Sequence, residues 1–142
     1  MDRDRVITQL SIFVNNDPGR LAQVSKVLRE TGINMKAFNL AESQEFGILR
    51  AIVDDPEESY EKLRSKGIIV RKTDVLGIKI DDAPGSLVEA SDAFGKEGVN
   101  IEYGYAYTGR KASAFFIRVN DLDKAIAILE REGIATLNSS EI

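Results

Sequence analysis

Apolar residues follow two spacings along this chain, and each spacing indicates a kind of secondary structure. Val6 to Val14 is an apolar-rich run that favours a strand. Leu21, Val24, Val27 and Leu28 recur at helical spacing. In order, the first half predicts a strand at Val6–Val14, a helix at Leu21–Arg29, strands at Ile33–Ala41 and Phe46–Val53, a helix from Asp55 to Gly67, and a short strand at Ile68–Val70.

The same order returns in the second half, at a constant shift and without a gap. Pro18-Gly19 recurs as Pro84-Gly85, so the shift is 84 − 18 = 66 positions. It also carries Gly32-Ile33-Asn34 to Gly98-Val99-Asn100. The second half therefore predicts a strand at Val75–Ile80, a helix at Gly85–Lys96, strands at Val99–Tyr107 and Ala112–Val119, a helix at Leu122–Glu132, and a strand at Ile134–Leu137.

Each half has the order βαββαβ, which predicts an α+β fold of two ferredoxin-like sandwiches. We expect domains at residues 1–72 and 73–142, joined by a short linker at Arg71–Thr73. Because repeats of this size have small cores, we expect the two to pack side by side, and the whole chain to form a homodimer.

The loop between the first strand and first helix of each repeat carries candidate binding chemistry. We interpret Asp17 as the N-cap of the helix and Pro18 as its first residue. Gly19 permits close approach of another atom to the backbone. The free N–H groups of such a helix start can hold a carboxylate or a phosphate.

Composition narrows the functional classes. The chain of 142 residues has no Cys and no His, which removes disulfides, thiolate nucleophiles, Ser-His-Asp triads and most zinc sites. A net charge of −4 disfavours nucleic acid as a partner. No apolar run is long enough for a membrane span, and no signal peptide is recognisable, so we expect a cytoplasmic protein. We predict no catalytic residues, no metal and no cofactor.

Both repeats resemble the ACT domain in one further pattern: Pro-Gly-x-Leu opens a helix, and Gly-Ile/Val-Asn opens the next strand. The resemblance covers nearly the whole chain, which looks like a stand-alone tandem ACT protein of the bacterial and archaeal amino-acid-binding type. It implies a regulatory protein whose ligand lies between two ACT units, touching the strand–helix loop of one and the start of the second strand of the other. It also implies a metabolic enzyme or a regulator as partner.

These considerations give a set of candidate ligand-binding residues on the two loops and the two second strands. They are Asn16, Asp17, Gly19, Arg20, Leu21, Asn34, Met35, Asp82, Gly85, Ser86, Leu87, Asn100, Ile101 and Tyr103. Simpler interpretations stay open for several of them. Asp17 and Asp82 are plausible helix caps, and Asn34 and Asn100 are plausible turn residues.

Tyr103, Tyr105 and Tyr107 alternate along one strand and so share a face. We expect packing for most of them, with Tyr103 the best candidate for ligand contact. The leading hypothesis is an amino-acid sensor without catalytic activity. The alternatives are a structural subunit that pairs with an enzyme or transcription regulator without a ligand, and a small enzyme that uses carboxylates or Lys.

Overall fold

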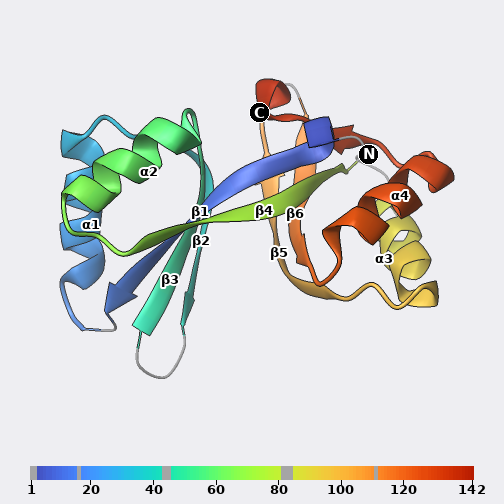
Figure 1. Cartoon of the computed structure of the whole chain (residues 1–142), viewed down its shortest axis with the longest axis horizontal. Helices are drawn as coiled ribbons and strands as arrows, with labels where there is room; N and C mark the ends of the chain where they lie inside the picture. Colours follow the sequence, from blue (N-terminus) through green and yellow to red (C-terminus); the bar gives the residue numbers. More distant parts are fainter. Residues whose placement is uncertain (1–2, 16, 43–45, 81–84, 111) are drawn as a thin grey trace. The chain divides into compact units, whose positions relative to one another are not determined.

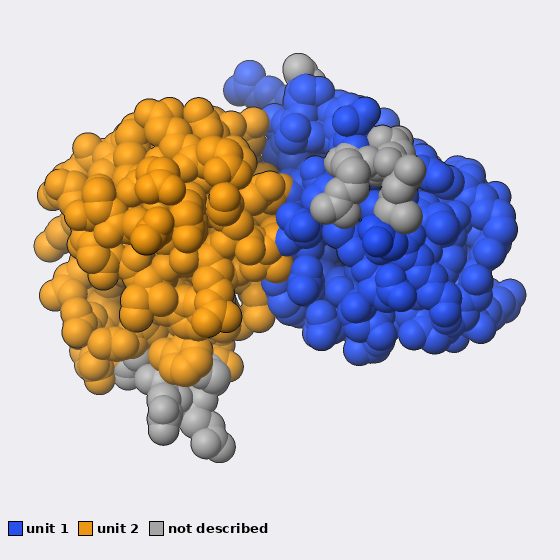
Figure 2. Space-filling view, in the orientation of Figure 1, with its two compact units in different colours: residues 1–7, 74–142 blue, residues 8–73 orange. Residues whose placement is uncertain are grey.

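The computed structural model describes residues 3–15, 17–42, 46–80, 85–110 and 112–142, with the backbone alone for Arg3 and Ser86. Its chain divides into two compact units (Figures 1 and 2). Unit 2 is Thr8–Thr73 and carries the first repeat; unit 1 is Met1–Ile7 with Asp74–Ile142 and carries the second. Each has two helices on one face of its strands (Figure 1), which is the predicted α+β, ferredoxin-like fold.

Unit 2 has the strand order β2-β3-β1-β4, with neighbours antiparallel where their register is defined. Its elements are β1 (Val6–Asn15), α1 (Arg20–Glu30), β2 (Met35–Glu42), β3 (Phe46–Val53), α2 (Pro56–Ser65) and the start of β4 (Val70–Lys79). Alternate residues of β1 and β3 form the core, where Leu10 lies opposite Ala51 and Ile12 opposite Leu49. Leu28 of α1 and Leu63 of α2 cover that face.

Unit 1 repeats the arrangement: β6 pairs with β4, β5 pairs with β6, and β7 pairs with the other side of β4. Its elements are the end of β4, α3 (Ser86–Lys96), β5 (Ile101–Thr108), β6 (Ser113–Val119), α4 (Leu122–Glu132) and β7 (Thr136–Leu137), with short 3-10 turns at Arg3–Arg5 and Ser139–Glu141. Phe94 of α3 and Leu129 of α4 pack against Leu76 and Ile117 in its core.

The expected linker at Arg71–Thr73 is wrong, because these residues lie inside β4. Their polar side chains have partners within unit 2. The Thr73 hydroxyl lies 3.0 Å from the Ser11 hydroxyl, Lys72 pairs with Glu57 at 3.0 Å, and the Arg71 guanidinium lies 5.6 Å from the Phe13 ring centroid. A polar run that reads as a linker is therefore a strand whose two ends belong to different units.

The tyrosines of β5 share one face, as predicted. Tyr105 is 8% exposed and its ring centroid lies 5.7 Å from that of buried Phe116; Tyr107 lies 5.8 Å from the same ring. A side chain at Gly77 would meet the Phe116 ring at 3.1 Å. Phe116 thus fills the space that this glycine leaves open, and the packing interpretation is confirmed for Tyr105 and Tyr107.

Aspartates cap α2 and α4, whereas the predicted cap of α1, Asp17, is wrong. Asp55 and Asp121 each accept a hydrogen bond from the backbone N–H three residues on, at 3.2 and 3.1 Å. Asp17, in contrast, caps nothing: α1 begins at Arg20, its N-cap is Gly19 at φ 87°, and no side chain bonds the cap. Pro18 is therefore not in the first helical turn. The Pro-Gly pair forms a tight turn before the helix instead.

Replacing each aspartate by alanine distinguishes these roles. We expect Asp55→Ala and Asp121→Ala to lower the free energy of unfolding by about 1 kcal/mol each, because each leaves an N–H group without its acceptor. We expect Asp17→Ala to stay within about 0.5 kcal/mol of the parent protein, as for an exposed site. Urea denaturation measures all three. An Asp17→Ala effect as large as the other two would contradict the Gly19 cap.

Unlike Asp17, Gly19 does not tolerate substitution, because its φ of 87° lies in the left-handed region that favours glycine. An added Cβ would meet nothing within 4 Å, so the cost of substitution is conformational rather than steric. We expect Gly19→Ala to destabilise the protein by about 1–2 kcal/mol. Gly95 in α3 is the matched control: it is equally open and has no positive φ. We expect Gly95→Ala to stabilise by about 0.5–1 kcal/mol, as for alanine in a helix. Equal effects in the two variants would contradict this account.

Candidate functional site

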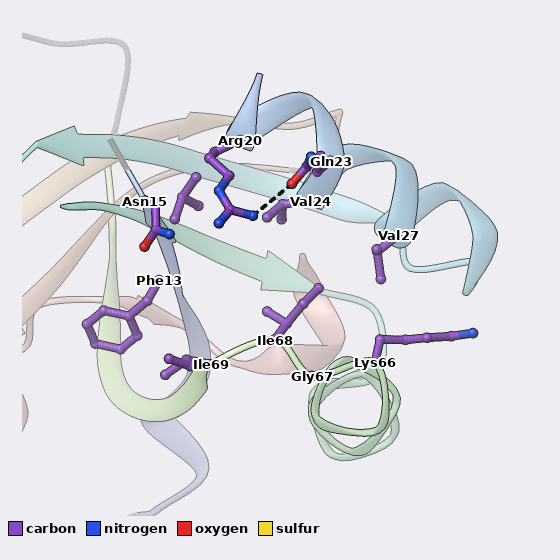
Figure 3. Close-up of a pocket in the computed structure, with 11 residues that line it drawn as sticks. Phe13, Asn15, Arg20, Gln23, Val24, Val27, Lys66, Gly67, Ile68 and Ile69 are labelled. Carbon is purple, nitrogen blue, oxygen red and sulfur yellow. Dashed lines mark hydrogen bonds between the residues drawn. The ribbon is translucent and has the colours of Figure 1, made fainter. Parts of the chain in front are cut away.

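The described part of unit 2 contains a pocket of about 340 Å³ beside the start of α1 (Figure 3). Three segments build it: the end of β1, the first two turns of α1, and the chain between α2 and β4. The residues that line it are Phe13, Val14, Asn15, Arg20, Gln23, Val24, Val27, Lys66, Gly67, Ile68 and Ile69. The backbone N–H of Phe13 donates to the Ile69 carbonyl at 2.9 Å and joins two of these segments. The pocket's size is near the lower end for small-molecule sites.

The turn at Gly19 sets the direction in which α1 starts. The Arg20 N–H donates to the Asp17 carbonyl at 3.2 Å, and Pro18 and Gly19 lie between the two bonded residues. Pro followed by a glycine near φ 80°, ψ 0° is typical of a type II turn. The first hydrogen bond of the helix is then the one that the Gln23 N–H donates to the Gly19 carbonyl. Among the described residues no acceptor is found for the N–H groups of Leu21 and Ala22, which lie in the first turn.

The pocket combines a cationic rim with an apolar floor. Arg20 is exposed, and its Nη1 donates to Gln23 Oε1 at 2.9 Å, which holds the guanidinium over the pocket (Figure 3). Val24, Val27 and Ile68 are half-buried and pack on the unit's core. Lys66 lies at the far end, and its side chain extends away from Arg20 (Figure 3). Among the residues that the structure describes, no acidic side chain lines this pocket.

Unit 1 has a cavity of about 350 Å³ that lies along the later part of α3 and overlaps part of the place that the pocket holds in unit 2. It is lined by Glu89, Asp92, Ala93, Lys96, Glu132 and Ile134. At the shift of 66, Glu89 corresponds to Gln23 and Glu132 to Lys66. Lys96 is paired with Asp92 at 3.1 Å. The two repeats thus share a cavity site between their helices, but one is basic and the other acidic.

The candidate residues of the first repeat fall into separate places. Arg20 lines the pocket. Asp17 and Leu21 line a smaller cavity of about 80 Å³, together with Val14, Asn15, Leu40, Glu42 and Gly47. Asn34 donates from Nδ2 to the Asp54 carboxylate at 3.3 Å, and Met35 packs on the core. Since α1 has 11 residues and rises ~1.5 Å per residue, it is about 16 Å long, and Asn34 follows its far end. One unit alone therefore does not bring Asn34 close to the candidate residues at the start of α1.

The candidate residues of the second repeat show the same separation. Gly85 is the N-cap of α3 at φ 105°, and Leu87 is 50% exposed in the first turn of α3. At the other end of the helix, the Asn100 N–H donates to Asn120 Oδ1 at 2.9 Å, Ile101 packs on the core, and Tyr103 is half-buried. Asn16, Asp82 and the Ser86 side chain lie outside the described residues. The bonds of Asn34 and Asn100 reach residues 20 positions away, so they are not bonds within a local turn, and the turn interpretation of these two residues stays a prediction.

Sequence reasoning missed most of the lining of the pocket. Gln23, Val24 and Val27 follow Arg20 at positions three, four and seven along one helical face, a signal that the sequence contains. Lys66 and Ile68, however, belong to a segment more than forty positions away. Only the fold brings them beside α1.

The groups whose pKa is displaced do not line the pocket. Hydrogen bonds from Arg131 lower the pKa of the Glu97 carboxyl, and a hydrogen bond to Glu57 raises the pKa of Lys72. Both pairs are exposed ion pairs at the surface. Within the described ranges, no cluster of three metal-ligating side chains occurs. None of the described helices is long and apolar enough to cross a membrane.

Comparison with known proteins agrees with the duplicated fold described above. A family model described as an ACT domain pair matches residues 5–140. The crystal structure of protein BT0572 from Bacteroides thetaiotaomicron is similar, with a TM-score of 0.87 and 39% identity over 96% of this chain and 95% of that one. A search of curated proteins gave no match.

More distant structures share the fold. The regulatory subunit of aspartate kinase from Thermus thermophilus, in a ligand-free form, has a TM-score of 0.54 and 20% identity, over 88% of this chain and 91% of that one. The regulatory subunit from Thermus flavus has a TM-score of 0.54 and 18% identity, over 89% and 90%. The family match over nearly the whole chain, and the same paired fold, identify this protein as a member of the ACT domain family, with a pair of ACT domains.

Proposed function

We propose that this protein is a regulatory amino-acid sensor without catalytic activity, and that it binds its ligand in the pocket of unit 2. The observation that carries the proposal is the reversed charge of the two repeat-related cavities. The unit 2 pocket offers Arg20 and Lys66 and no acid, whereas the unit 1 cavity offers three acids and one lysine. A ligand with a carboxylate is attracted to the first and repelled by the second.

The pocket suggests a pose for an amino acid. The ligand carboxylate meets the Arg20 guanidinium beside the start of α1, where the helix dipole also favours an anion. The carbonyl oxygens of the Asn15 and Gln23 side chains accept from its ammonium group. Its side chain lies on Val24, Val27 and Ile68, so an apolar amino acid fits best.

The regulatory part of the proposal draws on the family and on the fold shared with regulatory subunits of aspartate kinase. In this view the protein acts as a homodimer and passes the ligand signal to a metabolic enzyme or a transcription regulator. The alternative considered above, a structural subunit that works without a ligand, does not require a basic pocket over an apolar floor. The pocket therefore favours the sensor over that alternative.

Calorimetry with an apolar amino acid, for which leucine is a suitable probe, tests the site. We expect one molecule bound per chain, and we expect Arg20→Ser to weaken binding by at least tenfold. A charge-assisted hydrogen bond contributes about 1.5–3 kcal/mol, which corresponds to a factor of roughly 10–100. Serine is the residue that the second repeat carries at this position. The matched control is Lys26→Ala, an exposed cation on the same helix that does not line the pocket.

Three results would count against the proposal. Absence of binding for all twenty amino acids at millimolar concentration would reject the sensor. Two molecules per chain would reject the distinction between the cavities. Equal losses from Arg20→Ser and Lys26→Ala would reject the pose, because general surface charge would then explain the effect.

A further inference from the structure

The pocket of unit 2 continues past the start of α1 onto an exposed apolar surface. Phe13 and Ile69 line this part of the pocket, and Ile69 is 68% exposed although its neighbour Ile68 packs on the core. The Phe46 ring lies 5.5 Å from the Phe13 ring and is 37% exposed. We call the surface formed by Phe13, Phe46 and Ile69 the apolar end of the pocket. An exposed apolar surface that is continuous with a ligand pocket suits an apolar part of the ligand.

Backbone pairing and ring contacts hold the apolar end in place. The Phe13 N–H donates to the Ile69 carbonyl at 2.9 Å, and Asn15 lies opposite Phe46 in the β1–β3 ladder. The Arg71 guanidinium lies 5.6 Å from the Phe13 ring centroid. The surface is therefore formed before a ligand binds, which lowers the ordering entropy that binding must offset.

Asn15 connects the apolar end to the place proposed above for the ligand carboxylate. Figure 3 shows Asn15, Phe13 and Ile69 on one side of the Arg20 guanidinium. Asn15 and Phe13 are two positions apart on β1, so their side chains share a face of that strand. In the pose given above, the ligand carboxylate meets Arg20 and the ligand nitrogen meets the Asn15 side chain. A group attached to that nitrogen therefore runs from Asn15 onto Phe13 and Ile69.

The charges of the pocket favour an uncharged nitrogen at this point. Among the described residues that line it are two cations, Arg20 and Lys66, and no acid. A free amino acid carries an ammonium ion, which these cations repel and which meets no carboxylate among the described lining residues. An amide nitrogen carries no charge and needs one acceptor, which the Asn15 side-chain carbonyl supplies.

We propose that the ligand of this pocket is an N-acylated amino acid, whose acyl group lies on the apolar end. The proposal rests on the proposed function and names the ligand class of the same site. The carboxylate and the apolar side chain keep the places given above, and the amide N–H donates to Asn15 Oδ1. The acyl group covers Ile69 and Phe13, where an aromatic acyl group gains a ring–ring contact. The pocket volume of about 340 Å³ lies in the range of sites for ligands larger than one amino acid.

The second repeat has other side chains at the positions of the apolar end. At the shift of 66, Phe13 corresponds to Lys79 and Ile69 to Ala135. The Lys79 ammonium pairs with Glu141 at 3.3 Å, so an ion pair stands where unit 2 has an aromatic ring. The apolar end therefore belongs to the repeat that also carries the basic pocket, as a single ligand that contacts both would require.

Calorimetry with three related ligands, leucine, N-acetyl-leucine and N-benzoyl-leucine, tests the ligand class. The three share the carboxylate and the side chain and differ only at the nitrogen. We expect N-acetyl-leucine to bind at least as tightly as leucine, because acetylation removes the ammonium charge. We expect N-benzoyl-leucine to bind about tenfold more tightly than N-acetyl-leucine, because its ring covers Ile69 and Phe13.

Two variants test whether the acyl group lies where we propose. Ile69→Ala shortens an exposed side chain to the residue that the second repeat carries at this position. We expect it to lose most of the preference for N-benzoyl-leucine and to keep the parent affinity for N-acetyl-leucine. Phe38→Ala is the matched control, because Phe38 is 59% exposed in the same unit and does not line the pocket. We expect it to keep the preference, and circular dichroism melting checks that both variants are folded.

The outcomes separate an error in the ligand class from an error in the site. If leucine binds but acetylation abolishes binding, or if the benzoyl group adds no affinity, the ligand class is overturned and the amino-acid sensor stands. A preference for N-benzoyl-leucine that survives Ile69→Ala, or that Phe38→Ala removes as well, also overturns the proposed place of the acyl group. If none of the three ligands binds at millimolar concentration, both the site and the ligand class are overturned. Binding of N-benzoyl-leucine that depends on Ile69, without binding of leucine, supports the ligand class and rejects the free amino acid.

Discussion

The left-handed glycine between β1 and α1 is the constraint on which the site depends. At φ 87° Gly19 ends a tight turn, and α1 starts directly beside the end of its strand. The cap carries no side chain, so the first turn of the helix keeps N–H groups that no internal carboxylate occupies. The same turn places Arg20 at the pocket that is also lined by Ile68, a residue of the segment between α2 and β4. Gly85 repeats this backbone at φ 105°, which shows that the turn belongs to the repeat and not to one binding site.

The two repeats share the same backbone fold, but the side chains that line their cavities differ. Both units have a cavity between their helices, yet Gln23 and Lys66 are matched by Glu89 and Glu132. The edge strands diverged as well, with exposed Phe38 on one and Gly104 on the other. One repeat thus combines a basic pocket with an apolar edge, and its twin has neither. The two repeats therefore differ in the chemistry of their side chains, although each has the same fold.

Much of the fold could be predicted from the sequence, because the repeat presents the apolar spacing and the turn residues of each element twice. Helix α4 was predicted at its observed bounds. The errors have local causes. Asp17 has the chemistry of a cap, but the Pro-Gly turn moves the helix start past it. The polar run at Arg71–Thr73 resembles a linker, and it is a strand because β1 and α2 supply partners. Most of the pocket's lining was not predicted: Arg20 came from the motif, whereas Lys66 and Ile68 reach it through tertiary packing alone.

The central claim is that an amino acid binds beside α1 in one unit and is excluded from its twin. Amide NMR of the uniformly labelled protein, titrated with leucine, tests it most directly. The account predicts saturable shifts at Leu21, Ala22 and Ile68, and none at Leu87 and Val88, which hold the corresponding positions in α3. Shifts of equal size at both helix starts, or shifts confined to α3, would contradict it.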